Sequence, residues 1–174
     1  SLVFEQKWIK DFGRKEVFIM NKQEILVKKL IEKKYTISFA ESCTGGKMAA
    51  TIVDVADASK VLNASFVTYA NAAKMKYVNV SRETLDTLGA VSEQTAKEMA
   101  EGVAKANQAN VGVGITGIAG PTGGTVEKPV GTVCFGYTIN GETKTETVHF
   151  GNLGRNVVRE KSVEHVLDML ISML

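Results

Sequence analysis

The chain has few of the residues that build disulfide frameworks, zinc clusters or histidine-based catalytic sites. Its 174 residues include two cysteines, two histidines and two prolines. Cys43 and Cys134 form no Cys-x-x-Cys pair, so neither a disulfide framework nor a zinc cluster is indicated, and we expect a reducing compartment. His149 and His165 lie beside no turn signal, which disfavours a serine–histidine–acid triad.

Long apolar runs and a strong charge imbalance are also missing. No run approaches the roughly 18 apolar residues of a membrane span, and charged residues such as Lys7, Lys10 and Asp11 interrupt any signal-peptide core. The formal net charge is only +2, and the densest basic run, residues 28–34, fits the solvent-facing side of a helix. We therefore expect a cytoplasmic protein without a nucleic-acid or membrane partner.

The length and composition fit one globular domain that begins near residue 20. Apolar residues make up 44% of the chain and charged residues 23%, which is ordinary for a folded domain. Residues 1–19 mix aromatic and charged side chains and show no clear connection to the pattern that follows. They are interpreted as an N-terminal extension, as the tail of an upstream segment, or as residues foreign to the natural protein.

Helical and strand patterns alternate along the remaining chain. Helical spacing predicts helices over residues 23–34, 47–55, 71–77 and 155–174, and another that begins after an N-cap at Ser92. Short apolar runs predict strands over residues 36–40, 64–69 and 110–116. Residues 130–139 and 142–150 read as a β-hairpin around Asn140-Gly141. This order predicts an α/β fold with a mixed sheet and helices on both faces.

The first candidate site is the turn between a strand and a helix at Ser42-Cys-Thr44-Gly45-Gly46. The free N–H groups of a helix's first turn bind anions, and glycines let the backbone approach a ligand closely. Ser42 stands where a nucleophile would be presented to nearby amides. Alternatively, Ser42 or Thr44 only caps the helix. Cys43 is a second possible nucleophile, but a lone cysteine after an apolar strand is more typical of a small buried side chain.

The second candidate site is Tyr69-x-Asn71-x-x-Lys74. Asn71 can cap a short helix, which would place Lys74 on its first turn, while Tyr69 ends a strand. Both side chains would then face the same rim of the sheet. A lysine that loses its hydration can give up its proton and act as the base for a serine. The segment by itself favours the alternative, an exposed lysine on a short helix.

Two further patterns concern glycine and arginine. Gly112-x-Gly114-x-x-Gly117 imitates a dinucleotide fingerprint, but its glycines lie inside a strand and no helix follows, so we reject that interpretation. The loop from Thr116 to Thr125, including Gly120, could cradle a ligand through its amides. Arg155 and Arg159 share one face at the start of the last helix, where they could clamp a phosphate or remain solvated.

Taken together, these segments resemble the CinA C-terminal family over roughly residues 22–174. The resemblance rests on five motifs in the expected order: Ala-Glu-Ser42-Cys-Thr44-Gly-Gly, Phe-Val-Thr-Tyr69-x-Asn-x-x-Lys74, Gly-Ile-Thr116-Gly-Ile-Ala-Gly-Pro121, Lys-Pro-Val-Gly131-Thr-Val and Arg155-x-x-x-Arg159. It implies a three-layer α/β/α sandwich and a homo-oligomer, a dimer or higher. The family includes amidohydrolases that convert nicotinamide mononucleotide to nicotinate mononucleotide and ammonia in pyridine nucleotide salvage, without a metal or other cofactor. Some members carry an additional N-terminal domain, which this chain is too short to hold.

The resemblance and the residues together suggest a serine/lysine mechanism for a small nucleotide substrate. Ser42 would attack the carboxamide, a neutral Lys74 would act as base, and Tyr69 would orient Lys74 or relay a proton. The proposed substrate contacts come from the turn, the short helix, the glycine loop and the last helix: Thr44, Gly45, Gly46, Asn71, Thr116, Gly117, Gly120, Arg155 and Arg159. The alternatives are a non-catalytic nucleotide-binding or protein-interaction module linked to competence or DNA damage, and an amidohydrolase for a different amide.

Overall fold

The computed structural model describes residues 19–174, and the structural statements below concern this part of the chain. The helices are α1 (Lys22–Lys33), α2 (Lys47–Val53), α3 (Asn71–Val78), α4 (Arg82–Thr87), α5 (Glu93–Ala106) and α6 (Arg155–Met173). The strands are β1 (Ile37–Glu41), β2 (Phe66–Val67), β3 (Val111–Gly117), β4 (Thr132–Ile139) and β5 (Glu142–His149). A short 3-10 turn, η1, covers Ala58–Lys60.

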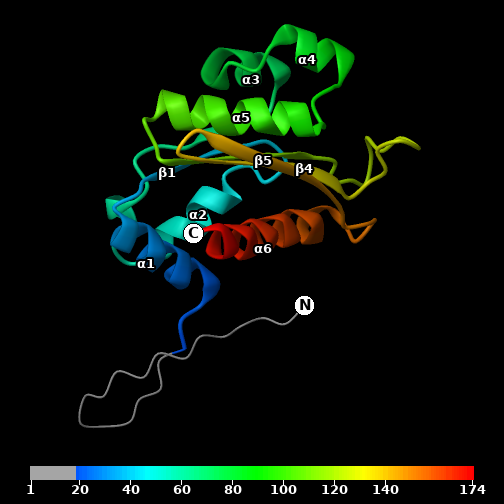
Figure 1. Ribbon diagram of the computed structural model, residues 1–174. Helices are drawn as coiled ribbons and strands as arrows, with labels where there is room; N and C mark the ends of the chain where they lie inside the picture. Colours follow the sequence, from blue (N-terminus) through cyan, green and yellow to red (C-terminus); the bar gives the residue numbers. More distant parts are fainter. Residues whose placement is uncertain (1–18) are drawn as a thin grey trace, which may run out of the picture.

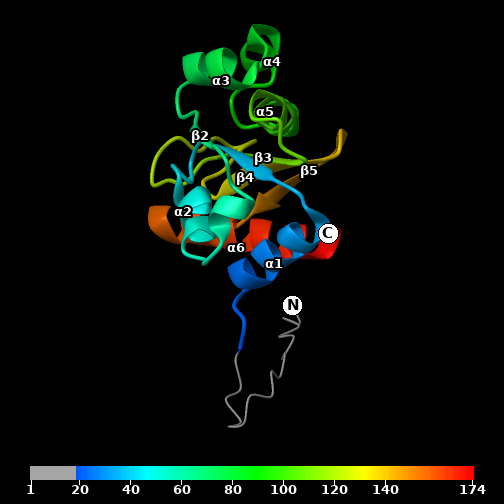
Figure 2. The ribbon, with the colours of Figure 1, turned by 90° about the vertical axis from the view of Figure 1, so that its left-hand side faces the viewer.

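The strands form one mixed sheet between two helical layers. Their order is β2-β1-β3-β4-β5, with β1 parallel to both of its neighbours and β4 antiparallel to both of its own. Helix α5 covers one face and carries α3 and α4 on its outer side, whereas α1, α2 and α6 cover the other face (Figure 1, Figure 2). The expected α/β fold, with helices on both faces of a mixed sheet, is confirmed.

The larger part of the apolar core lies between the sheet and α1, α2 and α6. Phe39, Ile115 and Phe135 of the sheet are fully buried there, together with Val158 and Leu170 of α6. The last helix therefore buries the apolar stripe that its sequence spacing predicts. This packing holds the start of α6 close to the ends of the central strands, which is where the candidate site forms.

Glycines on the opposite face let α5 lie close to the sheet. A Cβ on Gly112 would come within 2.2 Å of the Ala100 carbonyl oxygen, and one on Gly114 within 2.3 Å of the Ala96 oxygen. Gly136 on β4 is in the same situation, at 2.4 Å from the Ala96 oxygen. The Gly-x-Gly pattern of β3 thus serves helix–sheet packing, which agrees with the rejection of a dinucleotide fingerprint.

Short sequence signals correctly predicted the start of α5 and the turn of the β4–β5 hairpin. The Ser92 side chain accepts from the Thr95 amide and begins α5 as its N-cap. The hairpin of β4 and β5 turns at Asn140-Gly141, whose φ angles of 48° and 87° are the positive values that such a turn requires. One helix, α4, was not expected from the sequence, because its six residues are too short to show an apolar period.

The three parallel strands all end at one edge of the sheet. β1 is followed by Ser42, β2 by Thr68 and Tyr69, and β3 by the glycine-rich loop that begins at Ile118. After β1 the chain passes to the α2 face, whereas after β2 it passes to the α5 face (Figure 2). Ligand sites of α/β sheets form at such a switch point, outside the carboxyl ends of the strands.

Candidate active site

Ser42 lies in a tight turn between β1 and α2. Its amide donates to the Ile115 carbonyl at 2.9 Å, and its carbonyl accepts from the Gly45 amide at 3.0 Å. Gly45 and Gly46 have φ angles of +57° and +96°, a region that glycine enters without steric strain. The N-cap of α2 is Gly46, with no side-chain hydrogen bond, so the alternative that Ser42 or Thr44 caps this helix is wrong.

The first amides of α2 are already occupied by a buried carboxylate, which sequence reasoning did not single out. The Glu41 side chain is fully buried and accepts from the Met48 amide at 2.8 Å and from the Ala49 amide at 3.1 Å. An anion is stabilised at a helix N-terminus by the free N–H groups and the helix dipole. A substrate anion therefore has to use other donors. The signal in the sequence was an acidic residue directly before the Ser-x-Thr-Gly-Gly turn.

Lys74 is buried beside Ser42. Its side chain is only 1% exposed, and its Nζ lies 3.2 Å from Ser42 Oγ. The same nitrogen donates to the carbonyl oxygens of Thr68 at 2.9 Å and Tyr69 at 3.0 Å. The alternative of an exposed lysine is therefore wrong. The N-cap of α3 is Ala70, without a side-chain bond, so the expected capping by Asn71 does not occur.

The surroundings of Lys74 weaken its hold on a proton. Burial lowers the pKa of the Lys74 ammonium from its ordinary value, because removing the charged form from water is costly. None of the ion pairs within residues 19–174 includes Lys74, so no carboxylate offsets this effect. Its partners are a hydroxyl and two carbonyls, all of them uncharged. A depressed pKa next to a hydroxyl is the condition under which a lysine can act as a base.

Arg155 and Arg159 start on one face of α6 but contact different parts of the site. Arg155 donates to the Gly120 carbonyl at 2.9 Å and to the Tyr69 hydroxyl at 3.0 Å. Arg159 reaches the Ser42 turn instead, where Nε donates to the Cys43 carbonyl at 2.9 Å and Nη2 to the Thr44 carbonyl at 3.1 Å. The two guanidinium groups therefore do not form a single clamp. Tyr69 accepts from Lys74 through its backbone carbonyl, whereas its exposed side chain accepts from Arg155 rather than contacting Lys74.

A cavity of about 270 Å³ opens directly above Ser42. Its lining consists of Ser42, Cys43, Tyr69 and Arg155, and of six residues at and after the end of β3, between Gly117 and Gly123. Gly117 and Gly120 are thus placed at the site as expected. The cavity volume is close to the lower end of the range for ligand pockets, about 300 Å³, which suits one small molecule.

Other predicted contacts lie outside this cavity. The Thr116 hydroxyl donates to the Ala90 carbonyl at 2.7 Å, so it is held by the protein itself. Asn71 is exposed on the first turn of α3 and does not line the cavity. Gly45 and Gly46 shape the turn through their backbone angles. The Thr44 hydroxyl is fully buried and has no hydrogen-bond partner among the described residues.

Cys43 behaves as a buried apolar side chain, as the sequence suggested. It is 5% exposed, and burial raises the pKa of its thiol to about 12. The reactive form of cysteine is the thiolate, which is scarce at neutral pH under these conditions. The thiol of Cys43 is therefore poorly suited to act as a nucleophile at neutral pH.

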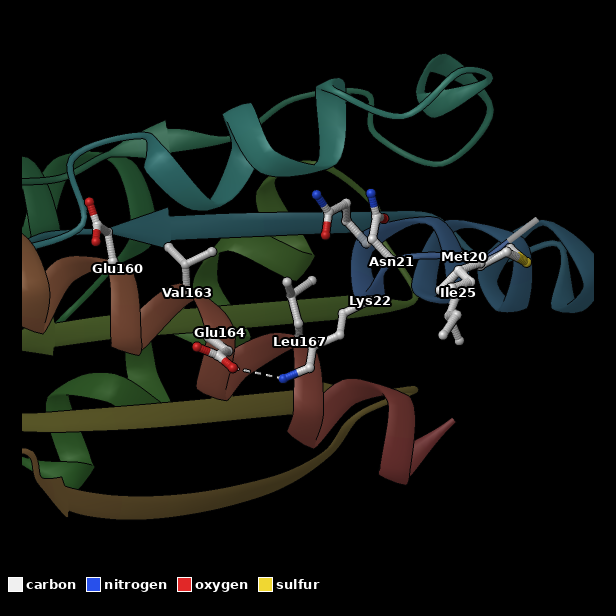
Figure 3. A pocket seen from close by; sticks show the side chains of 10 residues that line it. Met20, Asn21, Lys22, Ile25, Glu160, Val163, Glu164 and Leu167 are labelled. Atoms are coloured by element: carbon white, nitrogen blue, oxygen red, sulfur yellow. Dashed lines mark hydrogen bonds and ion pairs between the residues drawn. The ribbon is translucent and has the colours of Figure 1, made fainter. Parts of the chain in front are cut away.

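A second hollow lies away from these residues, between α1 and α6. It has a volume of about 470 Å³ and is lined by side chains such as Ile25, Val163 and Leu167, with Lys22 paired to Glu164 across it (Figure 3). None of the residues predicted to form the site lines it. Because several of the predicted residues line the smaller cavity beside Ser42 instead, that cavity is the candidate site.

Comparison with known proteins places the chain in a family. A family model described as the CinA C-terminal domain matches residues 20–174. The chain belongs to the CinA C-terminal domain family. A CinA-like protein of Kosmotoga olearia is 49% identical over 148 residues, which are 85% of this chain and 36% of that protein. The chain thus spans little more than a third of the length of this curated relative.

Solved structures of the family share the fold over nearly their whole length. A competence/damage inducible protein from Agrobacterium tumefaciens superposes with a TM-score of 0.82 at 40% identity, covering 90% of this chain and 98% of that one. A CinA superfamily protein from Escherichia coli gives a TM-score of 0.85 at 38% identity, with 88% and 89% covered. The architecture described above is therefore that of the family. Within residues 19–174, no helix has the length and apolar character needed to span a membrane.

Proposed function

We propose that the Ser42 site hydrolyses the carboxamide of a small nucleotide, nicotinamide mononucleotide, to the carboxylate and ammonia. The observation that carries this proposal is the arrangement around the Lys74 nitrogen, with a serine hydroxyl at 3.2 Å and two backbone carbonyls at 2.9 and 3.0 Å. The choice of substrate is taken from the family resemblance, and the short distance between Lys74 and Ser42 supports activation of the serine as a nucleophile.

Hydrogen bonds to the two carbonyls would determine where the lone pair of a neutral Lys74 points. A neutral amine has two N–H donors and one lone pair, and the carbonyls of Thr68 and Tyr69 can only accept. If each carbonyl takes one N–H, the lone pair is left for the third neighbour, Ser42 Oγ. The serine hydroxyl then donates to the lysine nitrogen, which is the arrangement that a general base requires.

The reaction follows in two halves. Ser42 Oγ attacks the carboxamide carbon while its proton passes to the Lys74 nitrogen, and the C–N bond then breaks as Lys74 returns that proton to the departing ammonia. The resulting ester is hydrolysed by water, which gives a proton to Lys74 as it attacks. Lys74 finally returns this proton to Ser42 Oγ as the carboxylic acid leaves, and the acid then gives its remaining proton to solvent to become the carboxylate. No step requires an oxidant or a metal ion.

Donors for the developing oxyanion are available beside Ser42. The amides of Cys43 and Thr44 take part in none of the backbone hydrogen bonds of the turn. One such donor typically contributes roughly 3 kcal/mol to the stabilisation of the transition state. We assign the anionic group of the substrate to Arg155, because it lines the cavity and two contacts leave it further N–H groups. Arg159 is not assigned to the substrate, because it donates to two carbonyls of the Ser42 turn.

Ammonia release from nicotinamide mononucleotide tests the proposal, with Ser42→Ala as the matched variant. We expect release by the natural sequence only, with Ser42→Ala folded and inactive. Binding of the nucleotide by both proteins without ammonia release, seen as thermal stabilisation, would favour the non-catalytic binding module. Ser42→Ala with full turnover would refute the assignment of the nucleophile.

A further inference from the structure

Arg159 is a half-buried cation that contacts no carboxylate in the described part of the chain. None of the ion pairs of residues 19–174 includes an arginine. Its guanidinium donates to the carbonyls of Cys43 and Thr44, and its Nη1 donates to the Asn156 side chain at 3.0 Å. All three acceptors are uncharged, and two of them belong to the Cys43–Thr44 and Thr44–Gly45 peptide units, close to Ser42.

Planarity of the peptide bond connects these carbonyls to the amides beside the nucleophile. In a trans peptide the N–H points opposite to the C=O of the same unit. The Cys43 carbonyl shares its peptide unit with the Thr44 amide, so the hydrogen bond from Arg159 fixes the direction of that N–H. The Ser42 carbonyl, bonded to the Gly45 amide at 3.0 Å, fixes the Cys43 amide in the same way.

The charge of Arg159 also strengthens the amide whose direction it fixes. A hydrogen bond from a cation to a carbonyl withdraws electron density from the peptide unit, which makes its N–H a stronger donor. Two consecutive amides held in fixed directions in a turn form a concave site for an anion. The Gly45 and Lys47 amides donate to carbonyls of the turn, and Glu41 accepts from the Met48 and Ala49 amides. Of the amides outside these bonds, those of Cys43 and Thr44 directly follow Ser42 and are the ones we assign to an oxyanion.

We infer that Arg159 is a positioning residue that orients and polarises the peptide after Cys43, so that the Thr44 amide stabilises the oxyanion formed on the carboxamide. This inference rests on the proposed function and deepens it. Arg159 itself does not touch the substrate in this assignment. Gly45 supports the arrangement, because a Cβ at this position would already lie 3.4 Å from Arg159 Nη2, at the limit of close contact.

Kinetics of Arg159→Met and Arg159→Lys test the inference. Loss of one oxyanion donor lowers kcat by about 100-fold or more, so we expect a fall of this order in Arg159→Met, with KM within about threefold of the natural value. Lysine restores the charge but cannot contact two carbonyls in a fixed plane, so Arg159→Lys should recover only a small part of kcat. Lys161→Met, an exposed position on the same helix, is the matched control and should leave both constants unchanged.

Chemical rescue separates positioning from a general loss of structure. Free guanidinium ion added at millimolar concentration to Arg159→Ala should restore part of kcat, and it should have no such effect on Ser42→Ala. Urea unfolding of each variant shows whether the fold is kept. A rise in KM with kcat unchanged would overturn the inference, because Arg159 would then contact the substrate. A loss of kcat that guanidinium does not restore, in a variant with lowered stability, would also overturn it.

Labelling of Ser42 by a fluorophosphonate distinguishes failure of this inference from failure of the proposed function. The reagent forms a tetrahedral adduct on an activated serine without any substrate, and its oxygen occupies the place of the oxyanion. We expect Arg159→Met to label about 100-fold more slowly than the natural sequence. Equal labelling rates would refute the role of Arg159 alone. A natural sequence that neither labels nor releases ammonia would refute the proposed function, and the inference with it.

Discussion

Replacing Lys74 with methionine removes the buried amine and keeps an unbranched side chain of similar shape. The fold lowers the pKa of Lys74, whereas in the unfolded chain it returns to about 10.4. Between these two values the unfolded chain binds one more proton than the folded protein. The free energy of unfolding therefore rises with pH in this window, with a slope of about 1.4 kcal/mol per pH unit from this one group.

Comparison of the natural sequence with Lys74→Met isolates this slope, because every other titrating group is common to both. The natural sequence should gain stability relative to the variant as the pH rises through the lowered pKa towards about 10. Below the lowered pKa both states of the natural sequence hold the proton, and the difference between the two proteins becomes constant. Urea unfolding at a series of pH values measures the free energy of unfolding of each protein.

The same titration should appear in the kinetics. If Lys74 is the base, kcat/KM for ammonia release rises with pH through the pKa that the stability difference reports, and Lys74→Met loses about 100-fold or more of the activity. A stability difference that does not change with pH would refute the reasoning, since Lys74 would then keep its proton in the fold. A flat rate profile beside a sloping stability difference would separate the burial of Lys74 from its role as base.

Three further predictions concern the support of the site. Glu41→Gln keeps the shape but sets an amide nitrogen against one N–H donor of α2, so urea unfolding should show a loss of about 3 kcal/mol. Gly114→Ala would place a Cβ 2.3 Å from the Ala96 oxygen, and we expect a loss of about 3 kcal/mol, with a lower unfolding temperature by calorimetry. Arg155→Met should raise KM for nicotinamide mononucleotide by about 10- to 100-fold but should not raise KM for nicotinamide riboside, which lacks the phosphate. Equal increases for both would contradict the assignment of Arg155 to the anion.

Several features of this protein were determined by short stretches of sequence. The hairpin follows from Asn140-Gly141, because few other pairs adopt positive φ at both positions. The start of α5 follows from Ser92, whose side chain bonds an amide three residues later. The Ser42 turn follows from Gly45 and Gly46. Each signal is local, since the residues that make the contact are close together in the chain.

The chemistry of the site was decided by tertiary structure. Ser42 and Lys74 were both candidates from the sequence, but only the packing of α3 against α5 brings Lys74 Nζ to 3.2 Å from the serine. Burial, which sets the charge of Lys74, is a property of everything packed around it and leaves no pattern in its own segment. The same holds for the separation of Arg155 from Arg159. Spacing placed both on one face of α6, yet the loops that meet that face decided which one reaches the cavity and which one holds the turn.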